Sequence, residues 1–156
     1  MSKTVAGNPS EKGYWESRVK NAPNEKDMLF IDGRREEFWA RVRNQLGPWK
    51  GLNVLDIACG YGQFSNLFLP DKYTGMDFSE EMLKLAKQKN PDKTFKQADI
   101  RELELDKKYD VIFEVNSLRS LGMTPEQFNE KFNKNANKVV ACLEADVFTI
   151  YQNYGR

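Results

Sequence analysis

The 156-residue sequence contains no histidine and only two cysteines, Cys59 and Cys142. Without histidine, the common zinc sites, histidine-based catalytic triads and histidine general bases are excluded. Both cysteines lie in apolar, strand-like runs, where a thiol usually packs as a small hydrophobic side chain. We therefore expect no metal site and no histidine-dependent catalysis.

An excess of charge and long apolar runs are also absent. Lys and Arg number 24 against 23 Asp and Glu, so the formal net charge is +1. Such a balance provides no overall field that would draw the protein to nucleic acid or to an anionic membrane. No apolar run is long enough to span a bilayer, and the N-terminus lacks the apolar core of a signal peptide. We therefore expect a cytoplasmic protein with no nucleic-acid and no membrane partner.

The N-terminal third of the chain differs from the rest. Residues 1–12 are polar and are expected to form a mobile segment. Residues 13–50 are expected to be helical, with a short helix that ends before Pro23 and a longer stretch over 24–46 whose apolar residues recur at helical spacing. Residues 51–156 are expected to form the main domain.

In this main domain, short apolar runs alternate with helical patterns. Helices are expected over Phe64–Leu69, after the N-cap residue Ser79 and after the N-cap residue Thr124. Strands are expected from Val54 onward and over residues 72–76, 93–97, 109–115 and 138–143, with 147–151 as a further candidate. Strands separated by helices imply a mostly parallel sheet with helices on both faces, which is a doubly wound α/β fold.

Polar groups fall at the ends of four successive strands. The turn Gly60-Tyr61-Gly62 follows the first strand, Asp77 ends the second, Asp99 ends the third, and Asn116-Ser117 follow the fourth. Because the carboxyl ends of parallel strands share one edge of the sheet, these groups are expected along one rim, where doubly wound folds bind ligands.

The residues of this rim limit the class of ligand. A dinucleotide site would have a third glycine where Ser65 stands, and the sequence has no Gly-Lys-Ser/Thr loop to hold phosphates. A carboxylate at the position of Asp77 is suited to accept hydrogen bonds from a ribose diol. The pattern therefore favours an adenosine-type nucleoside without phosphates.

Four segments together resemble the class I S-adenosylmethionine (SAM)-dependent methyltransferases: Val54–Gln63, Tyr73–Leu83, Ala98–Ile100 and Tyr109–Phe113. The resemblance implies a Rossmann-like domain with strand order 3-2-1-4-5 and SAM as cofactor. It implies that the loop Ala58-Cys59-Gly60-Tyr61-Gly62 lies against the methionine portion of SAM. It also implies that Asp77 holds the ribose hydroxyls, Phe78 packs on the adenine, and Asp99 accepts from the adenine amino group, with Ile100 beside it.

Several of these residues have a second interpretation. Asp56 either orients the glycine loop or binds the cofactor through water. Asp77 could be only a helix-capping residue, and Asp99 an ordinary loop acid. In the helical region before the first strand, which often forms a lid in this family, Tyr14, Trp15 and Arg18 could cover the carboxylate end of SAM, or Trp15 could simply pack.

The catalytic residues are not determined by the sequence. Asn116, Ser117 and Arg119 lie where relatives meet their acceptor substrates, and Asn116 could also contact the cofactor. A general base is needed only when the acceptor carries a proton, and Glu114, Asp146 or a tyrosine could serve.

Two features depart from the family pattern. Ala58 stands where the first glycine of the loop is usual, a substitution that the fold tolerates if this position has ordinary backbone angles. The chain also ends at Arg156, where relatives continue through a helix and a closing hairpin. Either 147–151 is a single remnant strand, or strand five is left as an edge, through which a homodimer could form.

The expected function is in-line methyl transfer from SAM to a small-molecule acceptor, because the chain has neither an appended domain nor a basic stripe for nucleic acid. Two alternatives stay open. The domain could bind SAM without transferring methyl, as a sensor or as a subunit of a complex, or it could degrade SAM by hydrolysis or lyase chemistry.

Overall fold

Six strands form one sheet in the computed structural model of the protein, which describes residues 33–153. Their order is β3-β2-β1-β4-β5-β6, with β1 to β5 parallel and β6 antiparallel to β5. The strands are β1 (Val54–Ile57), β2 (Tyr73–Asp77), β3 (Thr94–Gln97), β4 (Tyr109–Val115), β5 (Ala136–Leu143) and β6 (Phe148–Gln152). The predicted doubly wound sheet with order 3-2-1-4-5 is confirmed, and β6 extends it.

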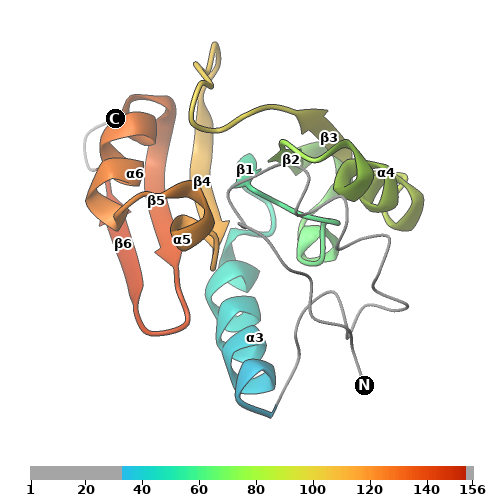
Figure 1. Ribbon diagram of the computed structural model, residues 1–156, viewed down its shortest axis with the longest axis horizontal. Coiled ribbons are helices and arrows are strands. Elements are labelled where there is room, and N and C mark those ends of the chain that lie inside the picture. Colours follow the sequence, from blue (N-terminus) through green and yellow to red (C-terminus); the bar gives the residue numbers. More distant parts are fainter. Residues whose placement is uncertain (1–32, 154–156) are drawn as a thin grey trace.

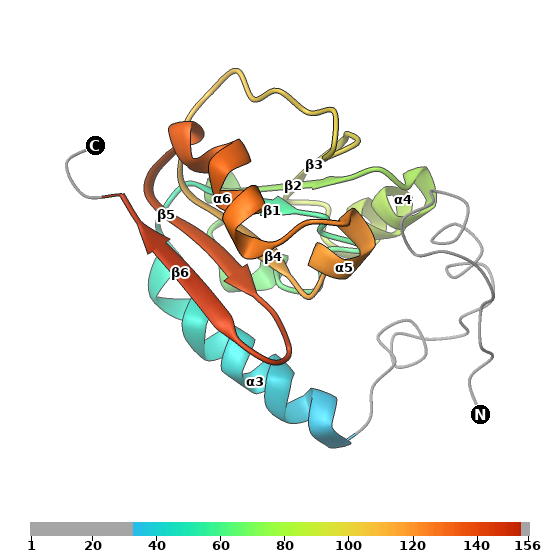
Figure 2. The same cartoon turned by 60° about the vertical axis from the view of Figure 1, so that its left-hand side comes forward.

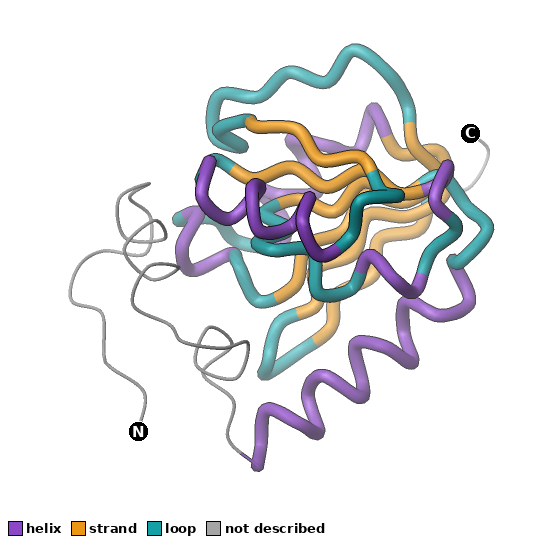
Figure 3. The backbone as a smooth tube through the Cα atoms, turned by 90° about the vertical axis from the view of Figure 1, so that its right-hand side faces the viewer, coloured by secondary structure: helices purple, strands orange, loops and turns teal. Residues whose placement is uncertain are grey.

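Helices cover both faces of this sheet (Figures 1 and 3). On one face, α3 (Gly33–Leu46) and α4 (Glu80–Lys89) pack against a core that includes Val54, Val111 and Phe113. On the other face, α5 (Leu118–Leu121) and α6 (Pro125–Phe132) pack against Leu55, Ile57 and Ile112. Alternate residues of the central strands thus enter opposite cores, which is why β1 and β4 are apolar at nearly every position.

The predicted helix starts after Ser79 and Thr124 are confirmed. The Ser79 hydroxyl accepts a hydrogen bond from Met82 N at 3.2 Å. Thr124 and Gln127 form a reciprocal pair, in which each side chain accepts from the other residue's backbone N–H. Each cap satisfies backbone donors that the first helical turn leaves without partners.

The helix predicted over Phe64–Leu69 is wrong. Only a 3-10 turn, η2 (Ser65–Leu67), forms there, and Phe68 and Leu69 are extended. Pro70 disfavours the helical conformation for the preceding residue, and the few residues left are too short a segment to offset the cost of starting a helix. The rings of Phe64 and Phe68 pack in the core instead. The ring centres of Phe64 and Trp39 lie 5.4 Å apart, and those of Phe68 and Phe113 lie 5.8 Å apart. Three further 3-10 turns are η1 (Gly47–Trp49), η3 (Pro70–Lys72) and η4 (Asn133–Asn135).

The C-terminal strand β6 occupies the edge that β5 would otherwise expose. It pairs with β5 from Leu143↔Phe148 to Val139↔Gln152. The alternative in which strand five is left as an edge is therefore wrong, and a homodimer joined at that edge loses its premise. The alternative, a single remnant strand at this position, is what the structure contains.

Helix α3 packs against this C-terminal hairpin, although the two are far apart in the sequence (Figure 2). The Phe38 and Phe148 rings lie 6.2 Å apart, and the Arg41 guanidinium donates to the carbonyl of Ala145 at 3.1 Å. Four apolar residues of α3 are buried in the core, namely Phe38, Trp39, Val42 and Leu46. The part of the N-terminal helical region that is described thus belongs to the core of the domain.

The predictions for residues 1–32, including the mobile segment, the first helix and the trio Tyr14, Trp15 and Arg18, lie outside the described residues. Within residues 33–153, none of the helices combines the length and the apolar character needed to cross a bilayer.

Candidate functional site

The strand register brings the predicted polar groups to one rim. Ile57 of β1 pairs with Met76 of β2 and with Glu114 of β4, and Asp77 pairs with Gln97 of β3. Because these four strands are parallel and in step, the segments that follow them leave the sheet at the same edge. The glycine turn, Asp77, Asp99 and Asn116 therefore share this rim.

The turn after β1 has three residues in the left-handed region, Ala58 (φ 58°), Gly60 (φ 59°) and Gly62 (φ 79°). Ala58 thus does not have the ordinary backbone angles that the sequence interpretation assumed for it. A left-handed alanine brings its Cβ close to the neighbouring carbonyl, at a cost of about 1 kcal/mol. The turn is held by Cys59 N, which donates to Met76 O, and by Gly62 N, which donates to Cys59 O, both at 3.0 Å.

The two glycines of this turn have different surroundings. A Cβ added to Gly62 would lie 2.9 Å from the Phe95 ring, whereas one added to Gly60 would meet only Gln63 Oε1, at 3.6 Å. Gly62 is therefore packed into the protein. Gly60 leaves open space above its main chain, which a ligand can approach.

Asp77 connects this turn to helix α4. Its Oδ2 accepts from Gly60 N at 2.9 Å and its Oδ1 accepts from Ser79 N at 3.0 Å. Only 6% of the residue is exposed. Burial raises the pKa of Asp77, and the hydrogen bonds from Ser79 and Gly60 oppose that rise. Since Ser79 provides the side-chain cap of α4, Asp77 is more than a capping residue.

Asp56 bonds to a residue that the sequence analysis did not single out. Its Oδ2 accepts from the Tyr73 hydroxyl at 2.6 Å. Burial raises the pKa of Asp56 to about 7, against the lowering effect of this hydrogen bond, and Asp77 raises it further. The side-chain hydrogen bond found for Asp56 thus goes to Tyr73 of β2, a pairing that no local pattern would reveal because the residues are 17 positions apart.

Asp99 is paired with Arg101, which the sequence analysis also missed. Asp99 Oδ1 accepts from Arg101 N at 3.0 Å and from Arg101 Nε at 3.2 Å. Burial acts to raise the pKa of Asp99, but the bonds from Arg101 outweigh it and the pKa lies below its usual value. The Arg101 guanidinium also lies 6.0 Å from the centre of the Phe78 ring. An acid followed two positions later by a base is too common a pattern to have indicated this link.

Two further predicted site residues, Ile100 and Cys59, also have buried side chains. Ile100 is 2% exposed and packs in the same core as Leu55, Ile57 and Met76. The Cys59 thiol is buried and donates to Gly60 O at 3.5 Å, and burial, followed by the charges of Asp56 and Asp77, raises its pKa well above the ordinary value. Either residue would meet a ligand at the rim through its main chain.

The segment after β4 contains the residues that were predicted to contact the methyl-acceptor substrate. Asn116 is exposed and left-handed (φ 53°), and its backbone N donates to Leu143 O at 2.9 Å. Arg119 is exposed on α5. Glu114, by contrast, is 0% exposed, and its Oε1 accepts from the Ser117 N–H and hydroxyl at 2.8 and 2.9 Å. A fully buried carboxyl cannot touch an acceptor, so Glu114 does not fit the role of general base in this conformation.

Burial raises the pKa of Glu114 well above its usual value, and Glu144 raises it further. Glu144 is a third residue that the sequence analysis missed. It follows β5 directly and shares a side-chain face with Cys142 by strand alternation.

A hollow of about 670 Å³ opens on the α3 side of the glycine turn, between α3 and the end of α4. Trp39, Arg43, Phe64 and Asn90 are among the residues that line it. In residues 33–153 no group of three or more potential metal ligands is present.

Comparison with known proteins adds to this geometry. A family model described as a methyltransferase domain matches residues 54–141, more than half of the chain. A demethylmenaquinone methyltransferase from Lactococcus lactis subsp. lactis is 32% identical over 71 residues, which make up 42% of this chain and 28% of that protein. The chain spans between 24% and 39% of the length of such curated relatives.

Solved structures share the fold. The DhpI-SAM-HEP complex has a TM-score of 0.65 and 21% identity, covering 89% of this chain and 67% of that one. Magnesium protoporphyrin IX methyltransferase (ChlM) from Synechocystis PCC 6803 with bound SAM has a TM-score of 0.59 and 20% identity, covering 90% and 77%. The parallel sheet, the glycine turn after β1 and the match over residues 54–141 agree, and the chain belongs to the methyltransferase domain family with the class I, Rossmann-like fold.

Proposed function

We propose that the chain binds SAM along the rim and transfers its methyl group to a small-molecule acceptor. The observation that carries this proposal is the 2.9 Å hydrogen bond from Gly60 N to Asp77. It holds the open glycine turn and the strand-end carboxylate together, and these are the groups that family resemblance assigns to the methionine and ribose portions of SAM.

The residues present fit that cofactor. The Asp77 carboxylate accepts backbone hydrogen bonds from Gly60 and Ser79, and its two oxygens offer further acceptor capacity for a ribose hydroxyl. Phe78 offers a ring for the adenine, and Asp99, held by Arg101, offers an acceptor for the adenine amino group. Ala58, Cys59, Gly60 and Ile100 would contribute main-chain contacts. Tyr14, Trp15 and Arg18 stay predicted contacts of the lid.

When bound, SAM supplies a methyl group on a positively charged sulfur, which makes the methyl electrophilic. The task of the protein is then to hold an acceptor in line and to exclude water. Asn116 is the exposed side chain nearest in sequence to the end of β4, and its amide can both donate to an acceptor and accept from it. Arg119 on α5 is the second candidate. The small acceptors in the names of the demethylmenaquinone and protoporphyrin relatives support a small-molecule substrate.

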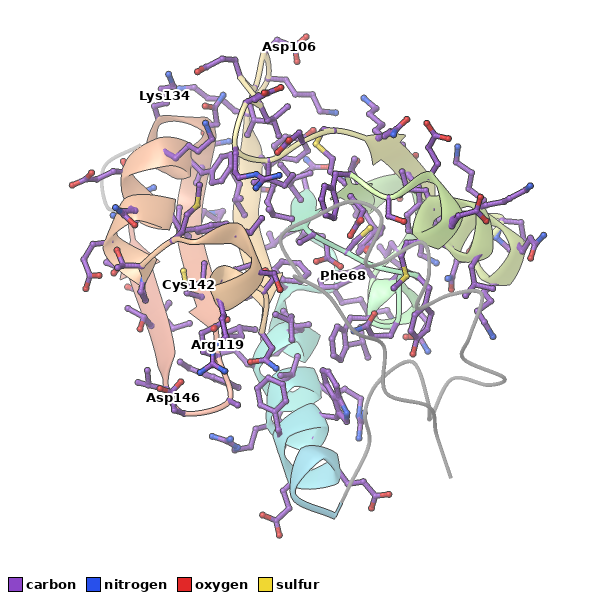
Figure 4. The ribbon with its side chains drawn as sticks, viewed as in Figure 1. Phe68, Asp106, Arg119, Lys134, Cys142 and Asp146 are labelled. Atoms are coloured by element: carbon purple, nitrogen blue, oxygen red, sulfur yellow. The ribbon has the colours of Figure 1, made fainter. Side chains whose placement is uncertain are left out.

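Binding is tested by calorimetric titration with S-adenosylhomocysteine. The wild type is expected to bind, and Asp77→Asn at least about tenfold more weakly, because one acceptor oxygen becomes an N–H donor. Asp106→Asn is the matched control, since Asp106 is exposed at the opposite edge of the sheet, before β4 (Figure 4). Absence of binding by the wild type, or equal binding by Asp77→Asn, would overturn the proposal.

Transfer is tested by incubating the protein with SAM and a panel of metabolites and measuring release of S-adenosylhomocysteine. Release that depends on one added metabolite supports methyl transfer. Turnover of SAM alone would instead indicate SAM degradation. Binding without any turnover would indicate a cofactor-binding subunit or sensor.

A further inference from the structure

Two glutamates lie on one side of the sheet at the ends of neighbouring strands. Glu114 is in register with Cys142 on β5, and Glu144 lies two positions beyond Cys142. Because side chains alternate along a strand, Cys142 and Glu144 point to the same face as Glu114. Residues placed diagonally in this way on adjacent strands are close enough for long side chains to meet.

The hydrogen bonding of these two carboxyl groups is incomplete unless one of them is protonated. Glu114 Oε1 is occupied by the N–H and the hydroxyl of Ser117. Glu114 Oε2 and Glu144 Oε2 are both buried, and neither has a hydrogen-bond partner among the described residues when both are taken as acceptors. Two ionised carboxylates repel each other, and neither buried Oε2 atom then has a donor to offset the loss of water.

We propose that Glu114 and Glu144 share one proton at neutral pH, as a hydrogen bond between their Oε2 atoms that clamps the end of β4 to the end of β5. Glu114 carries the proton and donates it to the carboxylate of Glu144. Glu144 is partly exposed, so a proton can exchange with solvent through it.

The neighbouring groups favour this state. Burial raises the pKa of Cys142, and Glu114, Glu144 and Glu126 raise it further, so the thiol stays neutral. Burial, Glu126 and Cys142 raise the pKa of Tyr151 in the same way. The charged and titratable groups on the elements around the pair include Cys142 (β5), Tyr151 (β6), Glu126 (α6), Arg119 (α5), Asp146 (the β5–β6 turn) and Arg41 (α3), of which Arg41 donates to Ala145 O.

The hydrogen bond between Glu114 and Glu144 positions Asn116, the residue that we propose contacts the methyl acceptor. Asn116 lies between Glu114 and Ser117, in a left-handed conformation, and its N–H is bonded to Leu143 O, directly before Glu144. Loss of the shared proton would push the two carboxylates apart and loosen this turn from both sides. Glu114 and Glu144 are thus positioning residues, and this step alone rests on the proposed function.

The shared proton is tested with Glu114→Gln, whose amide keeps an oxygen for Ser117 and donates to Glu144 at every pH. The pKa of Glu114 is higher in the folded protein than in the unfolded chain. The stabilisation that protonated Glu114 provides is therefore complete below the unfolded-state pKa and declines as pH rises toward the folded-state pKa. Thermal melting should show wild type and Glu114→Gln nearly equal at pH 5. The variant should gain several degrees over the wild type by pH 9, while the exposed Glu102→Gln control follows the wild type.

Glu144→Gln is the second variant, because its amide donates to an ionised Glu114 and should remove the same pH dependence. Infrared spectra of the wild type at pH 7 should contain a protonated carboxyl band that both variants lack. A variant less stable than wild type at every pH, a difference that does not change with pH, or an unchanged band would overturn the inference. If the wild type fails to bind S-adenosylhomocysteine, the proposed function fails, and the melting and infrared results still decide the shared proton.

Discussion

Asp77 and Glu114 are two buried carboxyl groups on the same rim, one at the end of β2 and one near the end of β4. Both oxygens of Asp77 accept from backbone N–H groups. Glu114 has donors at one oxygen only, and its second oxygen has none, with Glu144 as its acidic neighbour. The half of the rim that we propose for the cofactor is therefore built around a hydrogen-bonded carboxylate, and the half that we propose for the methyl acceptor is built around a carboxyl that favours its protonated form.

The difference shows that burial alone does not set the charge of a carboxyl group. Burial raises the pKa of both residues. Backbone donors oppose the rise at Asp77, whereas a second carboxyl adds to it at Glu114. The two residues differ in the group that faces the second oxygen, which is a backbone N–H at Asp77 and a second carboxyl at Glu114.

The largest expected change in the free energy of unfolding comes from replacing the carboxyl groups of Asp77 and Glu114 by amides. Asp77→Asn should lower the free energy of unfolding by about 3 kcal/mol, because the amide N–H faces a backbone donor that loses its charged acceptor. Glu114→Gln should change stability in the opposite direction at pH 8. Urea denaturation at that pH measures both, and two effects of the same sign would contradict the comparison.

A smaller effect is expected from an added methyl group in the glycine turn. Gly62→Ala should cost about 2 kcal/mol, from its left-handed backbone and from the contact with Phe95. Gly60→Ala has the backbone strain without the contact and should cost about 1 kcal/mol. Denaturation compares their stabilities. Equal costs would show that Gly62 is not tightly packed.

Asp56 is intermediate between Asp77 and Glu114, because its carboxyl group accepts from one side-chain donor, the Tyr73 hydroxyl. Its pKa is raised to about 7, so the ionised form weakens the folded state as pH rises from the unfolded value toward 7. Tyr73→Phe removes the donor that lowers this pKa, and should cost about 1.5 kcal/mol at pH 8 and less at pH 5. Urea denaturation at the two pH values tests the sign. Tyr109→Phe, at the start of β4, is the control and should show no such dependence.

The smallest expected change in stability compares Ala58 and Asn116, which among residues 33–153 are the two left-handed residues other than glycine. Ala58→Gly should stabilise the protein by about 0.5 kcal/mol, since strain is relieved at some cost in chain entropy. Asn116→Gly should change stability little or lower it, because asparagine tolerates this conformation. Differential scanning calorimetry resolves the two. A destabilised Ala58→Gly would mean that Ala58 is not strained.

Local sequence patterns were sufficient to predict much of the fold. The apolar runs located all six strands to within two residues, and Ser79 and Thr124 marked the starts of α4 and α6. These signals work because alternation and capping involve residues a few positions apart. The same patterns failed at Phe64–Leu69, where the apolar spacing of a helix is present but Pro70 follows too soon for one to form.

The amino-acid sequence by itself indicated the doubly wound sheet and the rim that gathers the glycine turn, Asp77 and Asp99, because periodicity and the alternation of strands and helices favour them. The strand order followed from the resemblance to the methyltransferase family. Only the tertiary structure decided which groups face each carboxyl: Tyr73 at Asp56, Arg101 at Asp99 and Glu144 at Glu114. It also decided that Ala58 is left-handed and that β6 covers β5. These features depend on strand register and side-chain packing between distant segments, which set the charge and the exposure of each group.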